Sequence, residues 1–424
     1  MYITHTDLEI QREPFVRPFG FKGSAFHEKW NLIVRLCDDR GNEAFGIGGL
    51  AVLWSDADVF SAHTETGGNV LQTALLEYAL QQVKDRDFSD PPALVDALVS
   101  DVHTYGKTIT QNPNLRLTFT LISLVALDNA AWMLYAKQQG HTAFEALIPE
   151  PYHPYLSNRQ THIALVPTVS YTLPMDELTT ILEEGAYILK IKIGHPGEET
   201  EMVAKDQAWL TQIHTLAKEF ETPMTDSGQI LYYLDANGRY QKKESMAQLL
   251  DHADKEGILD RIILIEEPFQ NPETTDVLGL PARFAGDESL HTVADIRTRV
   301  QQGYGAMAVK PAGKTLSLAF QMVEAAGQAN VPCFVADNAC VPVLVEWNKN
   351  VAARLPPFPG VKGGLMESNG PESYGTWDKL LSEYPLPDAS WLRSQKGAFV
   401  LEEDYYAQSG GIFLEPKSYT RLFR

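Results

Sequence analysis

Residues 188–193 are Ile-Leu-Lys-Ile-Lys-Ile, and this stretch decides how the rest of the chain is interpreted. Because the side chains of a β-strand alternate between two faces, Lys190 and Lys192 share one face and the isoleucines occupy the other. The isoleucine face is expected to pack against helices, which turns both ammonium groups toward the interior of a sheet. Two like charges in an enclosed space are costly unless anions lie beside them. A strand whose lysine face is exposed to solvent remains the alternative for this stretch alone.

Carboxylates stand at the ends of the next three apolar stretches. These stretches end at Asp235, Glu266 and Asp287. A single acid in such a position is ordinarily a loop residue or a helix cap. Three of them on neighbouring parallel strands would repel one another unless a cation lay between them. A set of oxygen ligands with room for water suits Mg²⁺, which binds oxygen at about 2.0–2.1 Å.

Two of these acids have an acidic neighbour in the sequence. Only one of Glu266 and Glu267 is expected to be a ligand, because alternation points the two side chains in opposite directions. The same expectation holds for Asp287 and Glu288. The next apolar run ends at Lys310, which is expected to lie across the interior from the first lysine-bearing strand.

Short apolar runs alternate with helical stretches over residues 161–370. Strands are predicted at 162–170, 187–193, 230–236, 262–267, 283–287, 305–310, 332–337 and 361–366. Helices are predicted at 176–185, 200–219, 244–256, 292–302, 315–329 and 341–354. Only the gap between 267 and 283 is too short for a full helix. This alternation predicts an α/β fold, a modified (β/α)7β barrel of the TIM type rather than an open doubly wound sheet.

The rest of the chain divides around this barrel. Residues 1–135 are expected to form an α+β region, with a strand at 30–37, helices at 69–84 and 91–105, and a final apolar helix. Residues 136–160 are rich in proline and are interpreted as a linker. The barrel takes residues 161–370. Residues 371–424 have no place in the barrel and are expected to return to the N-terminal region.

The composition bears on partners and location. Apolar residues make up 44% of the 424-residue chain and charged residues 21%, which is a globular balance. The net charge of −20 disfavours nucleic acid as a partner. Three cysteines without a C-x-x-C pattern, and a start without a secretory signal, favour a cytoplasmic location. A small-molecule carboxylate substrate is the expected partner, and assembly with further copies of the chain stays open.

The stretch 115–136 is apolar enough to raise the question of a membrane span. It contains Arg116, Asp128 and Asn129. An aspartate at the centre of a membrane helix costs about 2.5–3.5 kcal/mol on insertion scales. We therefore expect a buried helix of a globular domain and no membrane association.

Lysine-x-lysine, three acids on successive strands and a later lysine together resemble the enolase superfamily, and within it the muconate-lactonizing-enzyme subgroup. The resemblance covers most of the chain: an N-terminal capping domain, a modified barrel and a C-terminal return. It implies that the three carboxylates at the strand ends bind Mg²⁺, namely Asp235, Glu266 and Asp287. It also implies that Lys192 and Lys310 are the acid–base pair and that Lys190 assists substrate binding.

The reaction that this resemblance implies is removal of a proton α to a substrate carboxylate, which gives an enediolate. A lysine base must fall from a pKa of about 10.4 to about 7–8, and Lys190 and a nearby dication would push Lys192 that way. The expected enzyme is a racemase or epimerase of an amino-acid derivative or dipeptide. Two alternatives stay open: a syn-dehydratase or cycloisomerase, similar to o-succinylbenzoate synthase or muconate cycloisomerase, and a non-catalytic binding protein.

The positions of the histidines and of one glycine-containing motif argue against several kinds of active site. The last histidine is His291, so a base like that of mandelate racemase, a histidine late in the barrel, is excluded. No H-x-H or H-E-x-x-H pair is present, which argues against a zinc hydrolase. The sequence Gly313-Lys314-Thr315 ends like a phosphate-binding loop, but Ala308 stands where that motif needs its first glycine.

Substrate identity is expected to depend on the eighth strand and the capping region. Dipeptide epimerases of this family carry Asp-x-Asp on strand eight, whereas residues 366–369 here are Met-Glu-Ser-Asn, which disfavours a dipeptide. Aromatic residues and glycines in 17–23 are interpreted as a mobile lid before the first long strand, with a plain surface loop as the alternative. The candidate substrate contacts are Asn237, Asp337, Asn338, Glu367, Asn369, Phe19 and Phe21.

Overall fold

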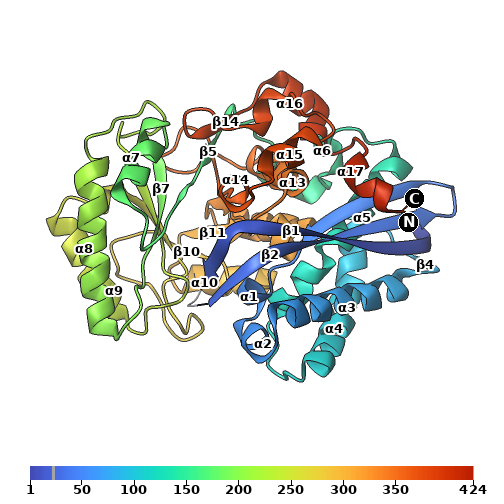
Figure 1. The fold of residues 1–424 in the computed structure, drawn as a ribbon, viewed down its shortest axis with the longest axis horizontal. Coiled ribbons are helices and arrows are strands. Elements are labelled where there is room, and N and C mark those ends of the chain that lie inside the picture. Colours follow the sequence, from blue (N-terminus) through green and yellow to red (C-terminus); the bar gives the residue numbers. More distant parts are fainter. Residues whose placement is uncertain (22–23, 424) are drawn as a thin grey trace.

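The computed structural model describes residues 1–21 and 24–423, and it consists of a barrel and an N-terminal domain that lies beside the barrel mouth (Figure 1). The barrel strands are β5 (His162–Leu165), β6 (Thr168–Val169), β7 (Ile188–Lys192), β8 (Leu231–Asp235), β9 (Ile262–Glu266), β10 (Phe284–Gly286), β11 (Ala306–Val309), β12 (Cys333–Val335) and β13 (Gly364–Met366). Each of these strands falls within a range that the sequence predicted.

The barrel is closed by a first strand that is split in two. Strand β5 pairs in parallel with β13, and β6 pairs in parallel with β7. Pro167 lies between the two halves, where a residue without a backbone N–H interrupts the ladder. All neighbours from β6 to β13 are parallel, so the strands present their carboxyl ends at the same mouth.

Helices cover the outside of the barrel wherever the sequence predicted them. They are α7 (Met175–Glu183), α8 (Glu199–Ala217), α9 (Lys243–Lys255), α10 (Val293–Gln301), α12 (Leu316–Gln328) and α13 (Pro342–Ala352), with a short α11 (Pro311–Lys314) after β11. Residues 267–283 contain no helix, as their length predicted. The predicted barrel with one missing helix is confirmed.

The N-terminal domain is a small antiparallel sheet packed against helices. Its sheet has the order β3-β2-β1-β4, from β1 (Tyr2–Phe21), β2 (Ser24–Asp38), β3 (Glu43–Gly49) and β4 (Arg86–Asp87). Its helices are α1 (Val52–Ser55), α2 (Ala57–Ala62), α3 (Glu65–Val83), α4 (Pro91–Thr110) and α5 (Leu117–Gln139). Helix α5 lies so close to β3 that a Cβ on Gly46 would stand 2.1 Å from the nitrogen of Ala130. Only glycine allows this contact.

Helix α5 is the apolar helix that raised the membrane question. By length and composition it is sufficient to cross a membrane, but 94% of its apolar window is buried inside the protein. Asp128, in the middle of it, accepts hydrogen bonds from the backbone N–H groups of Leu316 and Ser317. The carboxylate therefore caps barrel helix α12 and joins the N-terminal domain to the barrel.

Residues 17–21 of the expected lid belong to strand β1, which pairs with β2. Strand β1 runs through Phe21: its ladder with β2 is interrupted after Pro14 and resumes at Phe19, which pairs with Phe26. The ring of Phe19 packs against Phe26, with their centroids 5.1 Å apart. The prediction that these residues form a loop before the first long strand was wrong. Residues 22 and 23, and the side chain of Phe21, lie outside the described part of the chain.

The C-terminal segment contacts both parts of the molecule. Strand β14 (Ala398–Val400) pairs antiparallel with β5 and so extends the barrel sheet, contrary to the expectation that this segment has no place there. Helix α14 (Gly370–Ser373) and the last turn η5 (Arg421–Phe423) lie against β1. The remaining elements are α6 (Phe144–Leu147), η1 (Glu150–Tyr155), η2 (Leu259–Arg261), α15 (Trp377–Ser382), η3 (Ser390–Leu392), α16 (Glu403–Gln408), η4 (Ser409–Gly411) and α17 (Lys417–Thr420).

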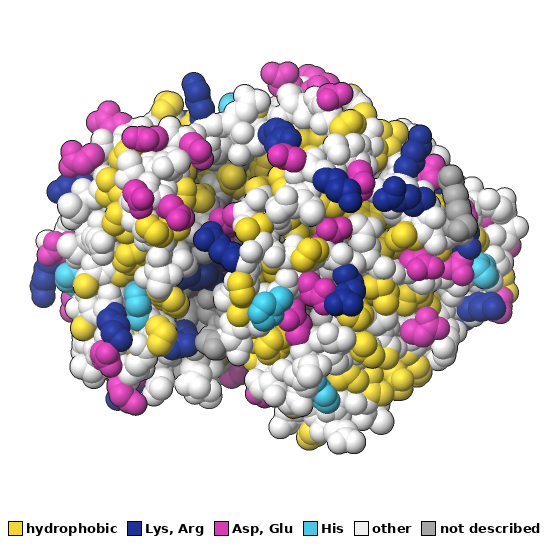
Figure 2. Space-filling model, in the orientation of Figure 1, with side chains coloured by type: hydrophobic (Ala, Val, Ile, Leu, Met, Phe, Trp, Pro, Cys, Tyr) yellow, Lys and Arg dark blue, Asp and Glu magenta, His cyan; other side chains and the backbone are white. Residues whose placement is uncertain are grey.

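The surface carries charges of both signs. On the face shown in Figure 2, lysines and arginines are interspersed with aspartates and glutamates rather than gathered in one patch. Many of the buried charges, by contrast, gather at the barrel mouth.

Candidate active site

The carboxyl ends of the barrel strands surround a chamber of about 40 Å³ that the N-terminal domain lines on one side. From that domain come Phe19, Phe26, Ala51 and Trp54. From the barrel come all the charged and polar residues that the sequence predicted for the site: Lys190, Lys192, Asp235, Asn237, Glu266, Asp287, Lys310, Asp337, Asn338, Glu367 and Asn369. Glu288 also lines the chamber.

Strand register brings the first charged group together. Lys192 of β7 stands beside Asp235 of β8, which stands beside Glu266 of β9. The ammonium group of Lys192 lies 2.5 Å from Asp235 Oδ2 and donates to Asn237 Oδ1 at 2.8 Å. Lys192 is thus held at the level of the carboxylates and not directed to solvent.

Lys190 is the central cation of the chamber. Its Nζ lies 3.0 Å from Asp235, 2.8 Å from Glu266 and 3.2 Å from Glu367. Tyr233 lies beneath the ammonium group and donates its hydroxyl to Glu266 at 2.5 Å. Lys190 is 3% exposed, so these carboxylates replace its hydration.

A second group lies across the barrel on β10 and the residues after β11. Lys310 Nζ lies 2.6 Å from Asp287 Oδ2, and its ammonium group stands 4.3 Å from the ring centroid of Trp54. Lys314 donates to the backbone carbonyl of Asp287 at 2.6 Å and lies 3.1 Å from its other carboxylate oxygen. Asp287 is therefore bound by two lysines.

The pKa directions follow from this arrangement. Burial alone would raise the pKa of Asp235, but the charges of Lys190 and Lys192 outweigh it and hold the pKa below its usual range. Burial alone would lower the pKa of Lys310, yet Asp287 and further carboxylates raise it to about 12. Burial and the charge of Asp235 raise the pKa of Glu266 well above its usual value. The charge of Lys190 therefore compensates the negative charge of Glu266 only in part.

Three carboxylates could share a metal ion. One oxygen atom from each of Glu266, Asp287 and Glu288 lies within 4.8 Å of the others. Ligand oxygens of one octahedral Mg²⁺ are about 3–4 Å apart, so small side-chain adjustments would bring these three to one ion. Asp235 stands next to Glu266 in the sheet, with its Oδ2 bound to lysines. The donor set of hard oxygens fits Mg²⁺.

Glu288 corrects the expectation that only one of Asp287 and Glu288 faces the site, since both line the chamber. Strand β10 ends at Gly286, so the alternation of side chains does not extend to the next two residues. Glu266 and Glu267 do diverge. Glu267 turns away and accepts hydrogen bonds from the backbone N–H of Asp287 and the hydroxyl of Ser289.

The residues after β12 and β13 bind one another. Asp337 accepts the backbone N–H of Asn369 at 2.8 Å, and Glu367 Oε2 accepts the N–H of Asp337 at 3.2 Å. Asn338 donates its amide to the carbonyl of Ala312. The cation that Glu367 meets is therefore Lys190 of the same chain, and Glu367 is 5% exposed.

Sequence reasoning missed three residues of this site. Lys314 was considered only as part of a phosphate loop, although its position four residues after Lys310 in a helical turn was a signal that it returns to the same place. Glu288 was not predicted because the side chains of the strand were assumed to alternate as far as this residue, although the strand ends before it. Trp54 comes from the N-terminal domain, and no local pattern marks it.

Comparisons with known proteins agree with this fold. No family model matches the chain. The o-succinylbenzoate synthase of Bacillus subtilis is 23% identical over 299 residues, which cover 68% of this chain but only 64% of that protein, less than two thirds of its length.

Solved structures match over nearly the whole chain. A dipeptide epimerase from Enterococcus faecalis, complexed with Mg and L-Leu-L-Tyr, has a TM-score of 0.63 at 14% identity and covers 89% of this chain and 92% of its own. The L-talarate dehydratase from Polaromonas, complexed with Mg and L-glucarate, has a TM-score of 0.62 at 14% identity, with coverage of 95% and 92%. The L-Ala-D/L-Glu epimerase from Bacillus subtilis has a TM-score of 0.61 at 16% identity, with coverage of 89% and 92%. The chain has the fold of the enolase superfamily, and the fold that the resemblance implied is confirmed.

Proposed function

We propose that the protein is a Mg²⁺-dependent enzyme that removes the proton α to a substrate carboxylate, and that it racemises or epimerises an amino-acid derivative. The observation that carries this proposal is the charge of the chamber: six carboxylates and three lysines line about 40 Å³. Burying so many ions is expensive unless they bind something. A surplus of carboxylates calls for a cation, and paired lysines supply groups that can move a proton.

Glu266, Asp287 and Glu288, with Asp235 beside them, are the residues that would hold the ion. When bound, Mg²⁺ would stabilise the negative charge that develops on the substrate carboxylate as the α-proton leaves. Metal binding would also change which carboxylates are free to pair with lysine. Asp235 and Asp287 now bind lysines through their carboxylates, and a shared cation would weaken those attractions.

Lys192 and Lys310 are the proposed acid–base pair. They stand on β7 and directly after β11, which lie opposite each other in the ring of strands. A planar intermediate between them would meet one ammonium or amine on each face, so one lysine could remove the proton and the other return it. Lys190, bound by three carboxylates, is better suited to hold the substrate carboxylate than to give up a proton.

The N-terminal domain would close the reaction site. Trp54 covers the ammonium group of Lys310, and the aromatic rings of Phe19 and Phe26 line the same wall. Apolar groups in this position exclude water and strengthen every electrostatic interaction inside the chamber. The small chamber volume corresponds to a closed arrangement that substrate entry must open.

The substrate is proposed to lack a free α-ammonium group. A dipeptide with a free amine would need an unpaired carboxylate near strand eight. Glu367 is the acid at that position, and it already binds Lys190 at 3.2 Å. An N-acylated amino acid, whose amide nitrogen carries no charge, fits this chamber better than a dipeptide does.

A syn-elimination similar to that of o-succinylbenzoate synthase is the second candidate. It is favoured by the curated relative, which is 23% identical over 299 residues and is named for that reaction. The same lysines and carboxylates would serve it, because elimination also begins with loss of an α-proton. A binding protein without catalysis is disfavoured, since the fold alone has no need of these costly charges.

Deuterium wash-in tests the proposal. The protein in D₂O with saturating Mg²⁺ is incubated with a panel of N-acyl amino acids and dipeptides, and the α-proton signal is followed by NMR. We expect exchange with N-acyl substrates, and loss of exchange when EDTA removes the ion. Binding of Mg²⁺ without exchange or elimination in any panel member would contradict the proposed function.

A further inference from the structure

A buried tyrosine of β8 lies in the barrel interior beneath the chamber. Because side chains alternate along the strand, Tyr233 shares the interior face with Asp235, and Tyr232 lies on the outer face. The ring of Tyr233 packs edge-on against Phe334 of β12, with the ring centroids 5.4 Å apart. Tyr233 is fully buried, so its hydroxyl must find its partners inside the barrel.

The hydroxyl of Tyr233 finds both of its partners among the charged groups of the chamber. It donates a hydrogen bond to Glu266 Oε2 at 2.5 Å, and it accepts one from Lys190 Nζ at 3.4 Å. A hydroxyl that accepts from an ammonium group is polarised and therefore donates more strongly to a carboxylate. Nothing in the proposed proton transfer uses this tyrosine.

The two carboxylate oxygens of Glu266 differ in their partners. Oε2 receives both the hydroxyl of Tyr233 and the ammonium group of Lys190, at 2.5 and 2.8 Å. Oε1 has no hydrogen bond or ion pair within residues 1–21 and 24–423, although Glu266 is only 1% exposed. A buried carboxylate oxygen without a protein partner is suited to bind a cation.

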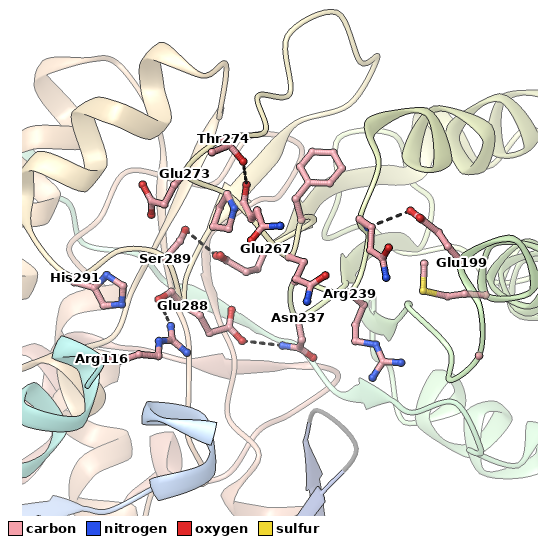
Figure 3. A pocket seen from close by; sticks show the side chains of 18 residues that line it. Arg116, Glu199, Asn237, Arg239, Glu267, Glu273, Thr274, Glu288, Ser289 and His291 are labelled. Carbon is pink, nitrogen blue, oxygen red and sulfur yellow. Dashed lines mark hydrogen bonds between the residues drawn. The ribbon is translucent and has the colours of Figure 1, made fainter. Parts of the chain in front are cut away.

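Glu288, another of the three acids that could share an ion, divides its oxygens in the same way. Its Oε1 accepts the side-chain amide of Asn237 at 3.0 Å, on the wall between the chamber and a larger cavity (Figure 3). Its Oε2 is buried and has no hydrogen-bond partner. In both acids, a neutral donor binds one oxygen and the other oxygen is left without a partner in the described chain.

Lys190 is not sufficient to fix the orientation of Glu266. Its ammonium group also lies 3.0 Å from Asp235 and 3.2 Å from Glu367, and in the proposed reaction it holds the substrate carboxylate. An ammonium group on a flexible chain acts as a point charge and sets little direction. Tyr233 stands on a strand, its ring is packed, and its single O–H points to one oxygen of one carboxylate. It supplies the direction that Lys190 lacks.

We propose that Tyr233 is a positioning residue of the metal site: its hydroxyl binds Oε2 of Glu266 and so leaves Oε1 free to bind Mg²⁺. This inference rests on the proposed function and deepens it, because it assigns a residue that acts through Glu266 rather than on the reacting atoms. Mg²⁺ requires nearly ideal octahedral geometry, whereas Ca²⁺ accepts longer distances and carboxylates that bind through one oxygen or two. A carboxylate held by one oxygen therefore favours Mg²⁺ over Ca²⁺.

Tyr233→Phe tests the proposal because it removes the hydroxyl and keeps the ring. Binding of Mg²⁺ and of Ca²⁺ to the full chain, without substrate, is measured by calorimetry. Loss of the hydrogen-bond partner of a metal ligand usually costs about 10–100-fold in metal affinity, and we expect a loss of that size for Mg²⁺. The loss for Ca²⁺ should be less than about threefold, because a carboxylate that can turn is able to bind the larger ion through both oxygens.

Tyr232→Phe is the matched control. It removes a hydroxyl from an equally buried tyrosine of the same strand, one that lies 2.9 Å from His214 Nδ1 of helix α8 on the outer face. Its affinities for both ions should equal those of the wild type. Urea denaturation without metal shows whether each variant is folded, and retained Ca²⁺ binding shows that the mouth of Tyr233→Phe is intact.

Three results would overturn the positioning role. They are an unchanged affinity of Tyr233→Phe for Mg²⁺, equal losses for Mg²⁺ and Ca²⁺, and an equal loss in Tyr232→Phe. The last two would indicate general damage to the fold rather than a change in the orientation of Glu266.

Proton exchange in D₂O on the same samples separates this proposal from the proposed function. A Mg²⁺ preference that depends on Tyr233, in protein that exchanges no α-proton, would leave the positioning role standing and refute the reaction. Exchange by the wild type, with unchanged Mg²⁺ affinity in Tyr233→Phe, would refute the positioning role and leave the reaction standing. Failure of the wild type to bind Mg²⁺ would overturn both.

Discussion

Among residues 1–21 and 24–423, ion pairs with both partners buried occur in two regions, which differ in their balance of charge. On helix α13, Glu346 and Lys349 form a pair with N and O atoms 2.5 Å apart, and both side chains are almost fully buried. One carboxylate meets one ammonium group there, and the carbonyl of Trp391 accepts a further hydrogen bond from the lysine. At the barrel mouth, six carboxylates share three lysines around one chamber.

The pKa directions show what this difference means. On α13, burial raises the pKa of Glu346 to about 7 and lowers that of Lys349, so both groups are pushed toward neutrality. At the mouth, carboxylates overcome the effect of burial and raise the pKa of Lys310 to about 12, whereas Glu266 is left with a raised pKa. Buried charge alone does not distinguish a site from a structural pair. A surplus of buried charges of one sign distinguishes a site from a structural pair.

The largest expected effect comes from removing the proposed acid–base lysines. Lys192→Ala and Lys310→Ala should each reduce α-proton exchange by about 10²–10⁴-fold, the usual contribution of a positioned acid or base. If each serves one face, the two variants should lose exchange from opposite stereoisomers, which chiral chromatography with NMR would detect. Lys362→Ala, at an exposed position before β13, is the control. Equal losses for both stereoisomers in both variants would contradict the two-base assignment.

Breaking the balanced pair should affect stability instead. Lys349→Met leaves Glu346 buried without its cation, and the free energy of unfolding should fall by about 3–5 kcal/mol. The double variant Glu346→Gln/Lys349→Met should recover most of that loss, because no unpaired charge remains. Urea denaturation measures both. A single variant as stable as the double variant would mean that the pair is not maintained as ions.

Mg²⁺ should stabilise the mouth and leave the α13 pair unaffected. At a free concentration of about 100 times the dissociation constant, ion binding should add about 2.7 kcal/mol to the free energy of unfolding. Glu266→Gln should abolish this gain. Without Mg²⁺ the same variant should be at least as stable as the wild type, because it removes a poorly compensated carboxylate.

Glu346→Gln is the matched control for this experiment, since it removes a carboxylate of the same kind and burial outside the chamber. Its response to Mg²⁺ should equal that of the wild type in thermal or urea denaturation. An equal gain in Glu266→Gln would contradict the proposed metal ligand.

The barrel mouth also shows which features of the structure the sequence could predict. Strand ends and alternation depend on local pattern, so the barrel strands and the residues at their carboxyl ends were predictable. The pairing of Lys190 with Glu367 was not, because it joins β7 to the residue after β13 through the barrel interior. A residue's partner depends on the closure of the whole ring, which no local window contains.

The N-terminal domain was harder to predict. Strand β1 carries two prolines and many charged residues, and such a pattern resembles a loop even though the strand pairs with β2 on both sides of an interruption between Pro14 and Phe19. Trp54 reaches Lys310 from a short helix of another domain. Likewise, Glu288 reaches the chamber only because β10 ends one residue before Asp287.

Lys29 is a third kind of buried charge, a lysine without a carboxylate partner. The smallest of the predicted effects concerns this residue. Its Nζ donates to the carbonyl of Asn338 at 2.5 Å and has no ion pair among the described residues. Its methylene chain passes Gly49, where a Cβ would stand 2.6 Å from Lys29 Cε. This lysine of β2 therefore joins the N-terminal domain to the barrel mouth through a backbone carbonyl and not through an ion pair.

Burial lowers the pKa of Lys29 to about 8. Above that pH the folded protein releases a proton that the unfolded chain, with a lysine pKa near 10.4, still binds, so stability rises with pH. Between pH 7 and pH 9 this group should add about 1 kcal/mol to the free energy of unfolding of the wild type. The difference in urea stability between wild type and Lys29→Met should shift by that amount in favour of the wild type. A difference that stays constant with pH would mean that Asn338 and nearby polar groups hold Lys29 fully charged, and that a carboxylate is not required to keep a lysine ionised in this interior.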